Sequence, residues 1–306
     1  MIKKLAESID NSVKSFCDEP VTVSFSGGVD SALIAHLAAK NCEVQLIAVG
    51  VIGSHDIEAA KSAAEKMKLE LERIEMKPEE IVKEGRILAS AFEMSEQEVE
   101  FMLPFWVVAK KAKNGMILCG QGADELFGGY QRFRREPEKV NLKNEVEELL
   151  KRIPGREKAI AEKFGLKLGC PYLKKEVISV AEKISTEERI SGIGKIPLRR
   201  AAKALGLPEE IANRAKKAAQ YGSGSQKALR RSKRHKIDIT LAFENEDIAR
   251  AVEFSTKPEN VGWVKLQRLG NEIKVEIASS TIEGLKRTMN DFLECATVAY
   301  RVKIDH

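Results

Sequence analysis

The sequence lacks the cysteine spacing of disulfide-rich and metal-binding domains. Its five cysteines are scattered singly through 306 residues, with no C-x-x-C pair and no regular interval. Such spacing argues against a disulfide framework, a zinc ribbon and a cysteine-ligated iron–sulfur cluster. The sequence also lacks a signal peptide and an apolar run long enough to cross a bilayer. We therefore expect a cytoplasmic protein without a membrane partner.

One glycine-rich segment lacks the residues of the two commonest nucleotide-binding loops. Ser26–Ser31 reads Ser-Gly-Gly-Val-Asp-Ser, without the Gly-Lys-Ser/Thr of a Walker loop or the G-x-G-x-x-G of a dinucleotide fingerprint. It follows the strand-like run Val21–Phe25. Gly27 and Gly28 let the backbone approach an anion, and a helix beginning near Ser31 would point free N–H groups at it. The segment predicts a phosphate pocket of the kind that binds ATP; the alternative is a tight turn without a ligand.

Two carboxylates are candidate metal ligands. Asp30 lies in the first loop, where a carboxylate beside phosphate needs an intervening cation because like charges repel. A second glycine-rich loop follows another buried run and contains Asp124 and Glu125. We expect both loops to end at one sheet edge, so that Asp124 joins Asp30 around one Mg²⁺–pyrophosphate unit and Glu125 orients them. The alternative is a solvated loop carboxylate.

Strand-like apolar runs alternate with segments of helical periodicity in the first part of the chain. This alternation predicts an α/β fold with a doubly wound parallel sheet, which binds ligands at its carboxyl edge. From about residue 141 to 206 the pattern predicts helices alone. The expected strands are Val21–Phe25, Val44–Val49, Leu69–Glu75 and Gly115–Cys119, and the expected helices include Ala32–Ala39, Ile57–Met67 and Val99–Lys111.

A second, smaller α+β domain is predicted near the C-terminus. Ile237–Phe243 alternates as a strand, Glu246–Phe254 has helical periodicity, and a hairpin around Gly270 and Asn271 precedes one long amphipathic helix. This β-α-β-β-α unit has few residues to cover one sheet face, which favours a homodimer or another partner. The expected domains are 1–225 and 237–306, joined by a basic linker at 226–236.

The positive charge of the chain is concentrated in one stretch. Residues 195–236 contain 13 Lys and Arg against two Asp and Glu, whereas the whole chain has a net charge of +5. Such a cluster is either a solvated helix face or a surface for phosphate or nucleic acid. The residues predicted to contact nucleic acid are Arg230, Arg231, Lys233, Arg234 and Arg268.

The two glycine-rich loops together resemble those of a known family. Ser26–Ser31 resembles the PP-loop of ATP pyrophosphatases, and with Gly120–Tyr130 it resembles the synthetase domain of asparagine and β-lactam synthetases. The resemblance covers about residues 15–225. It implies cleavage of ATP to AMP and pyrophosphate, with transfer of the AMP to a carboxylate or carbonyl oxygen. By loop position or by this resemblance, ATP and pyrophosphate are predicted to contact Ser24, Ser26, Gly27, Gly28, Asp30, Ser31, Val49, Gly50, Gly120 and Gly122.

A third block follows the order of the same family. Lys195–Ala201 matches K-x-x-L-R-x-A, and Arg214–Lys216 matches R-x-K before a glycine-rich turn. The resemblance implies that Lys195 and Lys216 are catalytic and contact the phosphates, and that Lys216 stabilises negative charge on the acyl-adenylate. The alternative is two surface lysines in a basic stretch.

The sequence departs from the family on the side of the acceptor substrate. Position 2 is Ile rather than Cys and no glutaminase domain precedes the synthetase part, so we do not expect ammonia from glutamine by the family's route. Lys167 stands where the family has a glutamate tied to amide formation, Gly169 replaces an arginine, and Lys174 replaces an aspartate. Gln121 replaces the glutamate of G-E-G. Lysine in place of a carboxylate inverts the local charge, so a substrate with an ammonium group, such as aspartate, would lose its partner, and a larger anionic substrate would gain one.

The C-terminal domain carries a second resemblance. Ile237–Arg301 resembles the small subunit of the KEOPS complex, which dimerises and helps to bind tRNA. The likeness depends on the order of elements and on apolar tracts, so a generic α+β dimerisation domain is the alternative. It implies tRNA, a second copy of the chain and KEOPS-type proteins as partners, with phosphate contacts from the basic stretch.

These patterns lead to one preferred hypothesis and two alternatives. The preferred one is a Mg²⁺-dependent ATP pyrophosphatase that adenylates an oxygen on tRNA, or on a group attached to it, for attack by a nitrogen nucleophile. The first alternative is an ammonia-dependent amide ligase, like asparagine synthetase, that acts on a small amino acid. The second is a non-catalytic tRNA-binding or KEOPS-associated protein.

Overall fold

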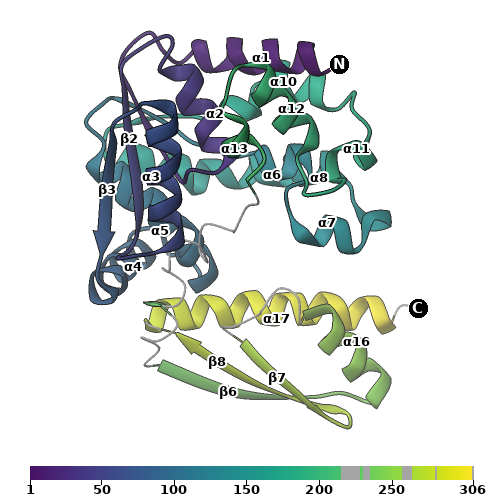
Figure 1. Ribbon diagram of the computed structural model, residues 1–306. Coiled ribbons are helices and arrows are strands. Elements are labelled where there is room, and N and C mark those ends of the chain that lie inside the picture. Colours follow the sequence, from purple (N-terminus) through teal and green to yellow (C-terminus); the bar gives the residue numbers. More distant parts are fainter. Residues whose placement is uncertain (215–227, 230–234, 257–263, 280, 305–306) are drawn as a thin grey trace. The chain divides into compact units, whose positions relative to one another are not determined.

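The chain divides into two compact units. The structure, a computed structural model, describes residues 1–214, 228–229, 235–256, 264–279 and 281–304 (Figure 1). The first unit comprises Met1–Met76 and Pro104–Ser223, and the second comprises Lys77–Leu103 and Gly224–His306. The second unit therefore includes a segment, 77–103, that lies far from the C-terminal domain in the sequence. The domain boundaries expected from the sequence stay predictions.

The first unit is built on a parallel sheet, as the sequence predicts, and this sheet has five strands in the described residues. The strand order is β3-β2-β1-β4-β5. The central strand pairs on both sides, since Val21 is in register with Val44 of β2 and with Met116 of β4. The order reverses between β1 and β4, which is where open α/β sheets bind ligands. The strands are β1 (Val21–Ser24), β2 (Val44–Val51), β3 (Leu71–Met76), β4 (Met116–Leu118) and β5 (Lys167–Gly169).

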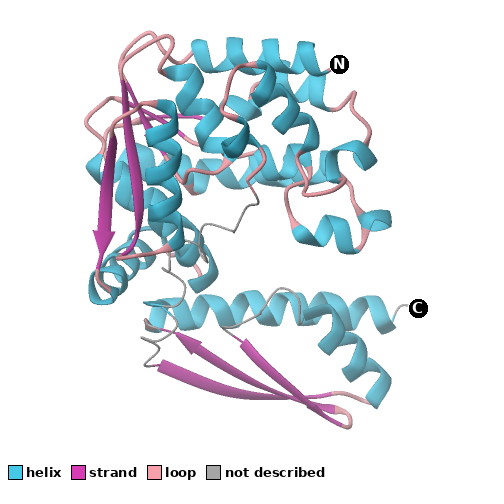
Figure 2. Cartoon of the chain, viewed as in Figure 1, coloured by secondary structure: helices cyan, strands magenta, loops and turns pink. Residues whose placement is uncertain are grey.

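Helices pack against this sheet and against one another (Figure 2). Leu5, Ile9 and Val13 of α1 are buried at intervals of four, so one face of that helix packs on the core. α2 is buried at every position except His36, because it lies in the centre of the core beside β1. The α-helices are α1 (Ile2–Lys14), α2 (Val29–Ala38), α3 (His55–Met67), α6 (Ala123–Phe127), α7 (Gln131–Arg135), α8 (Leu142–Arg152), α9 (Glu157–Lys163), α10 (Lys175–Ala181), α11 (Thr186–Ile190), α12 (Ile196–Ala204) and α13 (Glu209–Ala212), and the 3₁₀ turns are η1 (Pro137–Lys139), η2 (Ile153–Gly155) and η3 (Pro171–Leu173).

One strand lies where the sequence pattern predicts helices alone. β5 falls inside the segment 141–206 and pairs with β4 from Lys167 to Gly169. Three residues are too few for an alternating pattern to appear, and Lys167 is exposed. The expectation of helices alone is therefore wrong at this point, because pairing with β4 decides the local structure.

The second unit contains a three-stranded antiparallel sheet in the order β6-β8-β7. Its element order after residue 234 is the predicted β-α-β-β-α, with the hairpin turn at Gly270 and Asn271 between β7 and β8. Val252, Ile273, Val275, Ile277 and Phe292 form its core. The elements are β6 (His235–Ala242), α16 (Glu246–Thr256), β7 (Val264–Leu269), β8 (Glu272–Ser279) and α17 (Ile282–Ile304), together with α4 (Pro78–Phe92) and the start of α5 (Glu96–Lys111).

Within the described ranges, no helix combines the length and apolar character needed to span a membrane.

Phe292 anchors the long helix α17 in the core of the second unit, where it is fully buried. We expect Phe292→Ala to lower the free energy of unfolding by about 3–5 kcal/mol, because a large buried ring is lost and a cavity remains. Val298 of the same helix is 63% exposed, so Val298→Ala should change it by less than about 0.5 kcal/mol. Urea unfolding followed by circular dichroism measures both. Equal effects of the two substitutions would contradict the packing described for α17.

Candidate functional site

The two glycine-rich loops leave neighbouring strands at the same edge of the sheet. β1 and β4 run parallel and end in register at Val23 and Leu118, so the segments that follow them emerge side by side. Asp30 lies in the first turn of α2, and Asp124 lies in the first turn of α6. The structure therefore brings together the two carboxylates that the sequence predicts to act together.

A buried lysine joins these two carboxylates. The Nζ atom of Lys195 lies 2.7 Å from Oδ2 of Asp30 and 2.7 Å from Oδ1 of Asp124. Only 2% of the surface of Lys195 is exposed. A buried ammonium needs opposite charges close by, and here it has two. Lys195, which the sequence predicts to contact phosphate, thus lies at the centre of the site.

The backbone around Lys195 is strained and tightly held. Lys195 has a φ of 59°, a left-handed conformation that costs free energy for a residue other than glycine. Its N–H group donates to the carbonyl oxygens of Phe127 and Arg189, at 3.2 and 3.1 Å. A Cβ atom at Gly129 would overlap with the side chains of Asp124 and Lys195. The second glycine-rich loop is therefore shaped to leave room for the ion triad of Asp30, Asp124 and Lys195.

The first loop has the geometry of an anion cradle. Gly27 has a φ of +69°, and a Cβ atom there would lie 2.5 Å from the carbonyl oxygen of Ala59. Gly28 caps α2 and has no side chain to satisfy the N–H groups of the first turn. The hydroxyl of Ser31 accepts from the N–H group of Ser26 at 3.1 Å. The N-terminus of α2 can therefore offer N–H and hydroxyl donors to a phosphate.

Two tyrosines hold the carboxylate segments in place. The hydroxyl of Tyr172, which is fully buried, donates to the backbone carbonyl of Asp30 at 2.8 Å. Tyr130 donates to Glu125 at 2.7 Å. Burial raises the pKa of Glu125 above its usual range. The pattern of the sequence did not single out Tyr172, although a tyrosine in a buried apolar run needs a partner for its hydroxyl.

The carboxylates fit the magnesium ion that the sequence predicts. Asp30 and Asp124 already share one cation, the ammonium of Lys195, so they are spaced to bind a positive charge between them. No cluster of three or more His, Cys, Asp or Glu with metal-binding geometry occurs in the described ranges. Mg²⁺ commonly takes one or two carboxylates and completes its shell with water and substrate phosphates. Asp30 and Asp124 would therefore hold Mg²⁺ together with bound phosphate.

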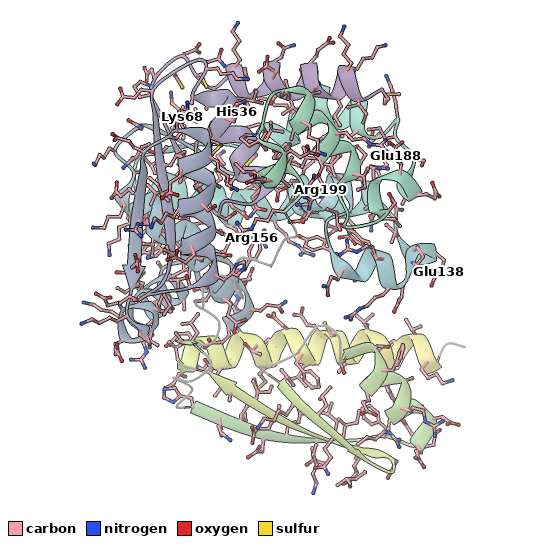
Figure 3. All side chains as sticks on the ribbon, in the orientation of Figure 1. His36, Lys68, Glu138, Arg156, Glu188 and Arg199 are labelled. Carbon is pink, nitrogen blue, oxygen red and sulfur yellow. The ribbon has the colours of Figure 1, made fainter. Side chains whose placement is uncertain are left out.

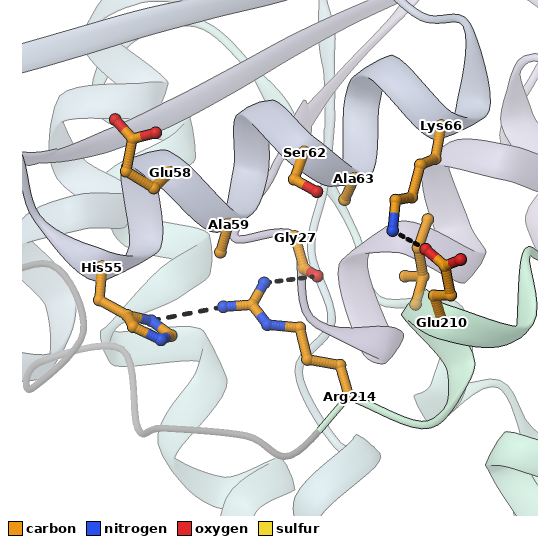
Figure 4. Close-up of a pocket in the computed structure, with 10 residues that line it drawn as sticks. Gly27, His55, Glu58, Ala59, Ser62, Ala63, Lys66, Glu210 and Arg214 are labelled. Atoms are coloured by element: carbon orange, nitrogen blue, oxygen red, sulfur yellow. Dashed lines mark hydrogen bonds and ion pairs between the residues drawn. The ribbon is translucent and has the colours of Figure 1, made fainter.

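A pocket of about 280 Å³ borders the first loop at Gly27 (Figure 4). Arg214 spans it by donating to the carbonyl of Gly27 at 3.2 Å, and it lies 3.4 Å from Nδ1 of His55. Burial lowers the pKa of Arg214. This volume lies just below the usual range for ligand pockets. Val49 and Gly50, predicted to contact ATP, are buried within β2 and do not line it.

The acceptor-side substitutions have partners of their own. Lys167 pairs with Met116, the first residue of β4, whereas the site lies beyond the last residue of that strand. The Nζ atom of Lys174 lies 4.6 Å from the ring centroid of Phe16. Gln121 donates to Glu157 at 2.6 Å. None of these contacts places either lysine beside Asp30, so the expected inversion of charge next to the site stays a prediction.

Lys195 and Arg199 of the basic stretch serve internal contacts. Arg199, labelled in Figure 3, donates to the carbonyl oxygens of Gly194, Ala212 and Arg214. Burial lowers the pKa of its guanidinium. In the second unit Arg268 contacts Glu246 at 2.6 Å. Arg268 is therefore paired with a carboxylate, which weakens its candidacy for nucleic acid. Lys216, Arg230, Arg231, Lys233 and Arg234 lie outside the described residues.

Comparison with known proteins identifies the family. The family model described as asparagine synthase matches residues 4–158 and 145–252. The chain belongs to this family.

Its curated relatives are longer proteins. A protein named putative asparagine synthetase [glutamine-hydrolyzing] 1, from Methanocaldococcus jannaschii, is 32% identical over 254 residues, which cover 69% of this chain and 47% of that protein. Asparagine synthetase B from Escherichia coli is 29% identical over 249 residues, which cover 72% of this chain and 45% of that protein. The chain thus spans about half the length of these relatives. Among solved structures, an NMN synthetase from Francisella tularensis is 16% identical, with a TM-score of 0.38 over 72% of this chain and 77% of that one.

Gly27 should tolerate no side chain. We expect Gly27→Ala to lower the free energy of unfolding by about 2 kcal/mol or more, because alanine disfavours the positive φ and its Cβ would press on the backbone of Ala59. Gly115→Ala is the matched control, since no atom lies within 4 Å of the added Cβ. Chemical denaturation compares the two variants. A stable Gly27→Ala protein would show that the loop is not packed against α3 as described.

Glu125 should make stability depend on pH. Its pKa is raised in the folded state, so folding favours the protonated form. The contribution of this carboxyl to the free energy of unfolding is therefore lost as pH rises from about the ordinary pKa of 4.5 through the folded pKa. Glu125→Gln cannot ionise and still accepts from Tyr130. We expect the variant to gain stability relative to the parent as pH rises through this window. The melting temperature of each protein between pH 4 and pH 8 measures this, with exposed Glu176→Gln as control. A constant difference would contradict the prediction.

Proposed function

We propose that the chain cleaves ATP to AMP and pyrophosphate with Mg²⁺, and transfers the AMP to a carboxylate or carbonyl oxygen that a nitrogen nucleophile then attacks. The observation that carries this proposal is the meeting of Asp30, Asp124 and Lys195 beside the anion cradle of Ser26–Ser31. Membership of the asparagine synthase family supports the reaction class. The acceptor of the AMP is argued separately below, because the chain spans about half the length of its curated relatives.

Each part of the site has a role in this reaction. The N-terminus of α2, with the hydroxyls of Ser26 and Ser31, would bind the pyrophosphate part of ATP. Asp30 and Asp124 would hold Mg²⁺, which neutralises charge on the phosphates. Lys195 balances both carboxylates in the structure as described. With ATP bound, its ammonium would face the phosphate oxygens, where a compact cation stabilises negative charge as pyrophosphate leaves. Lys216 keeps its predicted role at the acyl-adenylate.

Transfer RNA is the acceptor that we propose first. The charge of residues 195–236, with 13 Lys and Arg against two Asp and Glu, supports it. Lys195 and Arg199 have internal partners, so phosphate contacts would depend on the remaining cations, chiefly those at 216–234. The likeness of the C-terminal unit to the small KEOPS subunit, and with it dimer formation, stays a prediction that rests on element order. tRNA modification would follow if the adenylated oxygen belongs to a modified nucleoside.

Amide formation on a small amino acid is the second candidate. The names of both curated relatives favour it, since each is named as an asparagine synthetase. Ammonia would then be the nitrogen source in the simplest case. The non-catalytic alternative would leave the ion triad as a structural contact only.

Release of pyrophosphate from ATP and Mg²⁺ tests the reaction class. The purified chain is incubated with ATP and Mg²⁺ in three reactions, which contain bulk tRNA, aspartate with ammonium, or neither. It should release pyrophosphate in the reaction that contains the correct acceptor. Asp30→Asn should reduce this rate by about 100-fold or more, because the carboxylate charge for the cation is lost. Asp18→Asn, on an exposed loop residue, is the matched control and should keep the parental rate.

The three reactions separate the candidates. Stimulation by tRNA supports tRNA modification, and stimulation by aspartate with ammonium supports amide synthesis. A full rate in Asp30→Asn would contradict the assigned site. No pyrophosphate release in any of the three reactions, together with retention of tRNA by the protein on a filter, would favour the non-catalytic tRNA-binding protein.

A further inference from the structure

We infer that Cys119 and Cys170 form a site for a reversible intramolecular disulfide. The two residues are 51 positions apart in the sequence, and their Sγ atoms lie 3.6 Å apart in the fold. Both are thiols in the structure as described. The intervals between cysteines along the sequence gave no sign of this pair, because neighbouring strands bring it together.

The backbone geometry suits a disulfide. Cys119 and Cys170 directly follow Leu118 and Gly169, the last residues paired in register between β4 and β5. The pairing continues one step further, since the N–H group of Cys119 donates to the carbonyl of Gly169 at 3.1 Å. Neighbouring strands lie about 4.8 Å apart, and a disulfide bridges Cα atoms about 4.4–6.8 Å apart. Rotation of two side chains is therefore enough to form the bond.

The chemistry needs a small disulfide as oxidant, and the burial of the two thiols sets the order of attack. Cys119 is 5% exposed and Cys170 is the more exposed residue of the two, so we assign the first attack on the oxidant to Cys170. The thiolate of Cys170 attacks the small disulfide, forms a mixed disulfide and releases one small thiol. The thiolate of Cys119 then attacks Sγ of Cys170 and releases the second. Two protein thiols are oxidised and one small disulfide is reduced to two thiols.

The surroundings of the pair slow this exchange at neutral pH. The hydrogen bond with Cys119 and burial raise the pKa of the Cys170 thiol, and the negative charge of Glu157 on α9 acts in the same direction. Thiolate is the attacking species, so the reaction accelerates at alkaline pH. The pair therefore behaves as a slowly exchanging structural site rather than a fast redox catalyst.

The bond would close a loop that contains part of the ion triad. Asp124 lies between the two cysteines in the sequence, and Cys119 directly precedes Gly120 of the second glycine-rich loop. Pro171 and Tyr172 follow Cys170, and the hydroxyl of Tyr172 donates to the carbonyl of Asp30. Oxidation would thus restrain both segments that hold the carboxylates, and it would limit the freedom of the unfolded chain.

Thiol mapping tests the inference without any assay of activity. The reduced full-length chain is incubated with glutathione disulfide at pH 8.5, unfolded in the presence of N-ethylmaleimide to block all remaining thiols, and digested without reduction. We expect a cross-linked peptide pair containing Cys119 and Cys170, with a mass lower by two hydrogen atoms than the sum of the two reduced peptides. The melting temperature should rise by roughly 5–10 °C and return after reduction.

Matched variants assign the bond. Cys42→Ala is the control and should keep the cross-link. Cys42 also contacts another thiol, that of Cys17, and burial raises the pKa of the Cys17 thiol to about 12. Cys119→Ala should instead retain glutathione on Cys170. A lasting glutathione adduct at Cys170 in the parent chain, or recovery of both cysteines as maleimide adducts, would overturn the inference. So would a cross-link confined to other cysteines, such as exposed Cys295 joining two chains.

Discussion

The fold of the first unit depends on one buried ammonium that two carboxylates share. A lysine taken out of water without opposite charge would be expensive, so Lys195 requires Asp30 and Asp124 at short distance. These two residues come from the first turns of two helices that follow different strands, and Lys195 comes from the N-cap of α12. Charge balance therefore ties three distant parts of the sequence together. It also explains why the backbone of Lys195 stays in a left-handed conformation despite its cost.

The same charge balance gives the site its chemical character. Two carboxylates that accept an ammonium between them can also accept a metal ion, and the adjacent end of α2 attracts anions. In the second unit, by contrast, several of the described basic side chains are paired with carboxylates. Arg268 contacts Glu246, and Lys265 and Lys236 both contact Glu276, which lowers the pKa of that carboxyl to about 2. Binding of a polyanion would therefore have to depend on cations other than these.

The sequence revealed the sheet and the loops because their signals are local. Runs of β-branched residues predict β1 and β2, and the glycines of Ser26–Ser31 mark a close approach of backbone. Three features could not be predicted from the sequence because they arise only from long-range pairing. They are the three-residue strand β5, the hydrogen bond from Tyr172 to Asp30, and the neighbouring thiols of Cys119 and Cys170. Family resemblance named Lys195 as a phosphate ligand, but no periodicity could show that it neutralises two carboxylates.

The absence of a side chain at Gly129 has a consequence for how this sequence can change over time. A Cβ atom there would collide with the stem of Lys195 and with the carboxylate of Asp124. Replacement of Lys195 by a small residue would remove part of that obstacle, whereas any larger residue at position 129 would expel the lysine. The two positions are thus coupled by excluded volume as well as by charge. Among related sequences, we expect residues other than glycine at position 129 chiefly where the lysine is also missing.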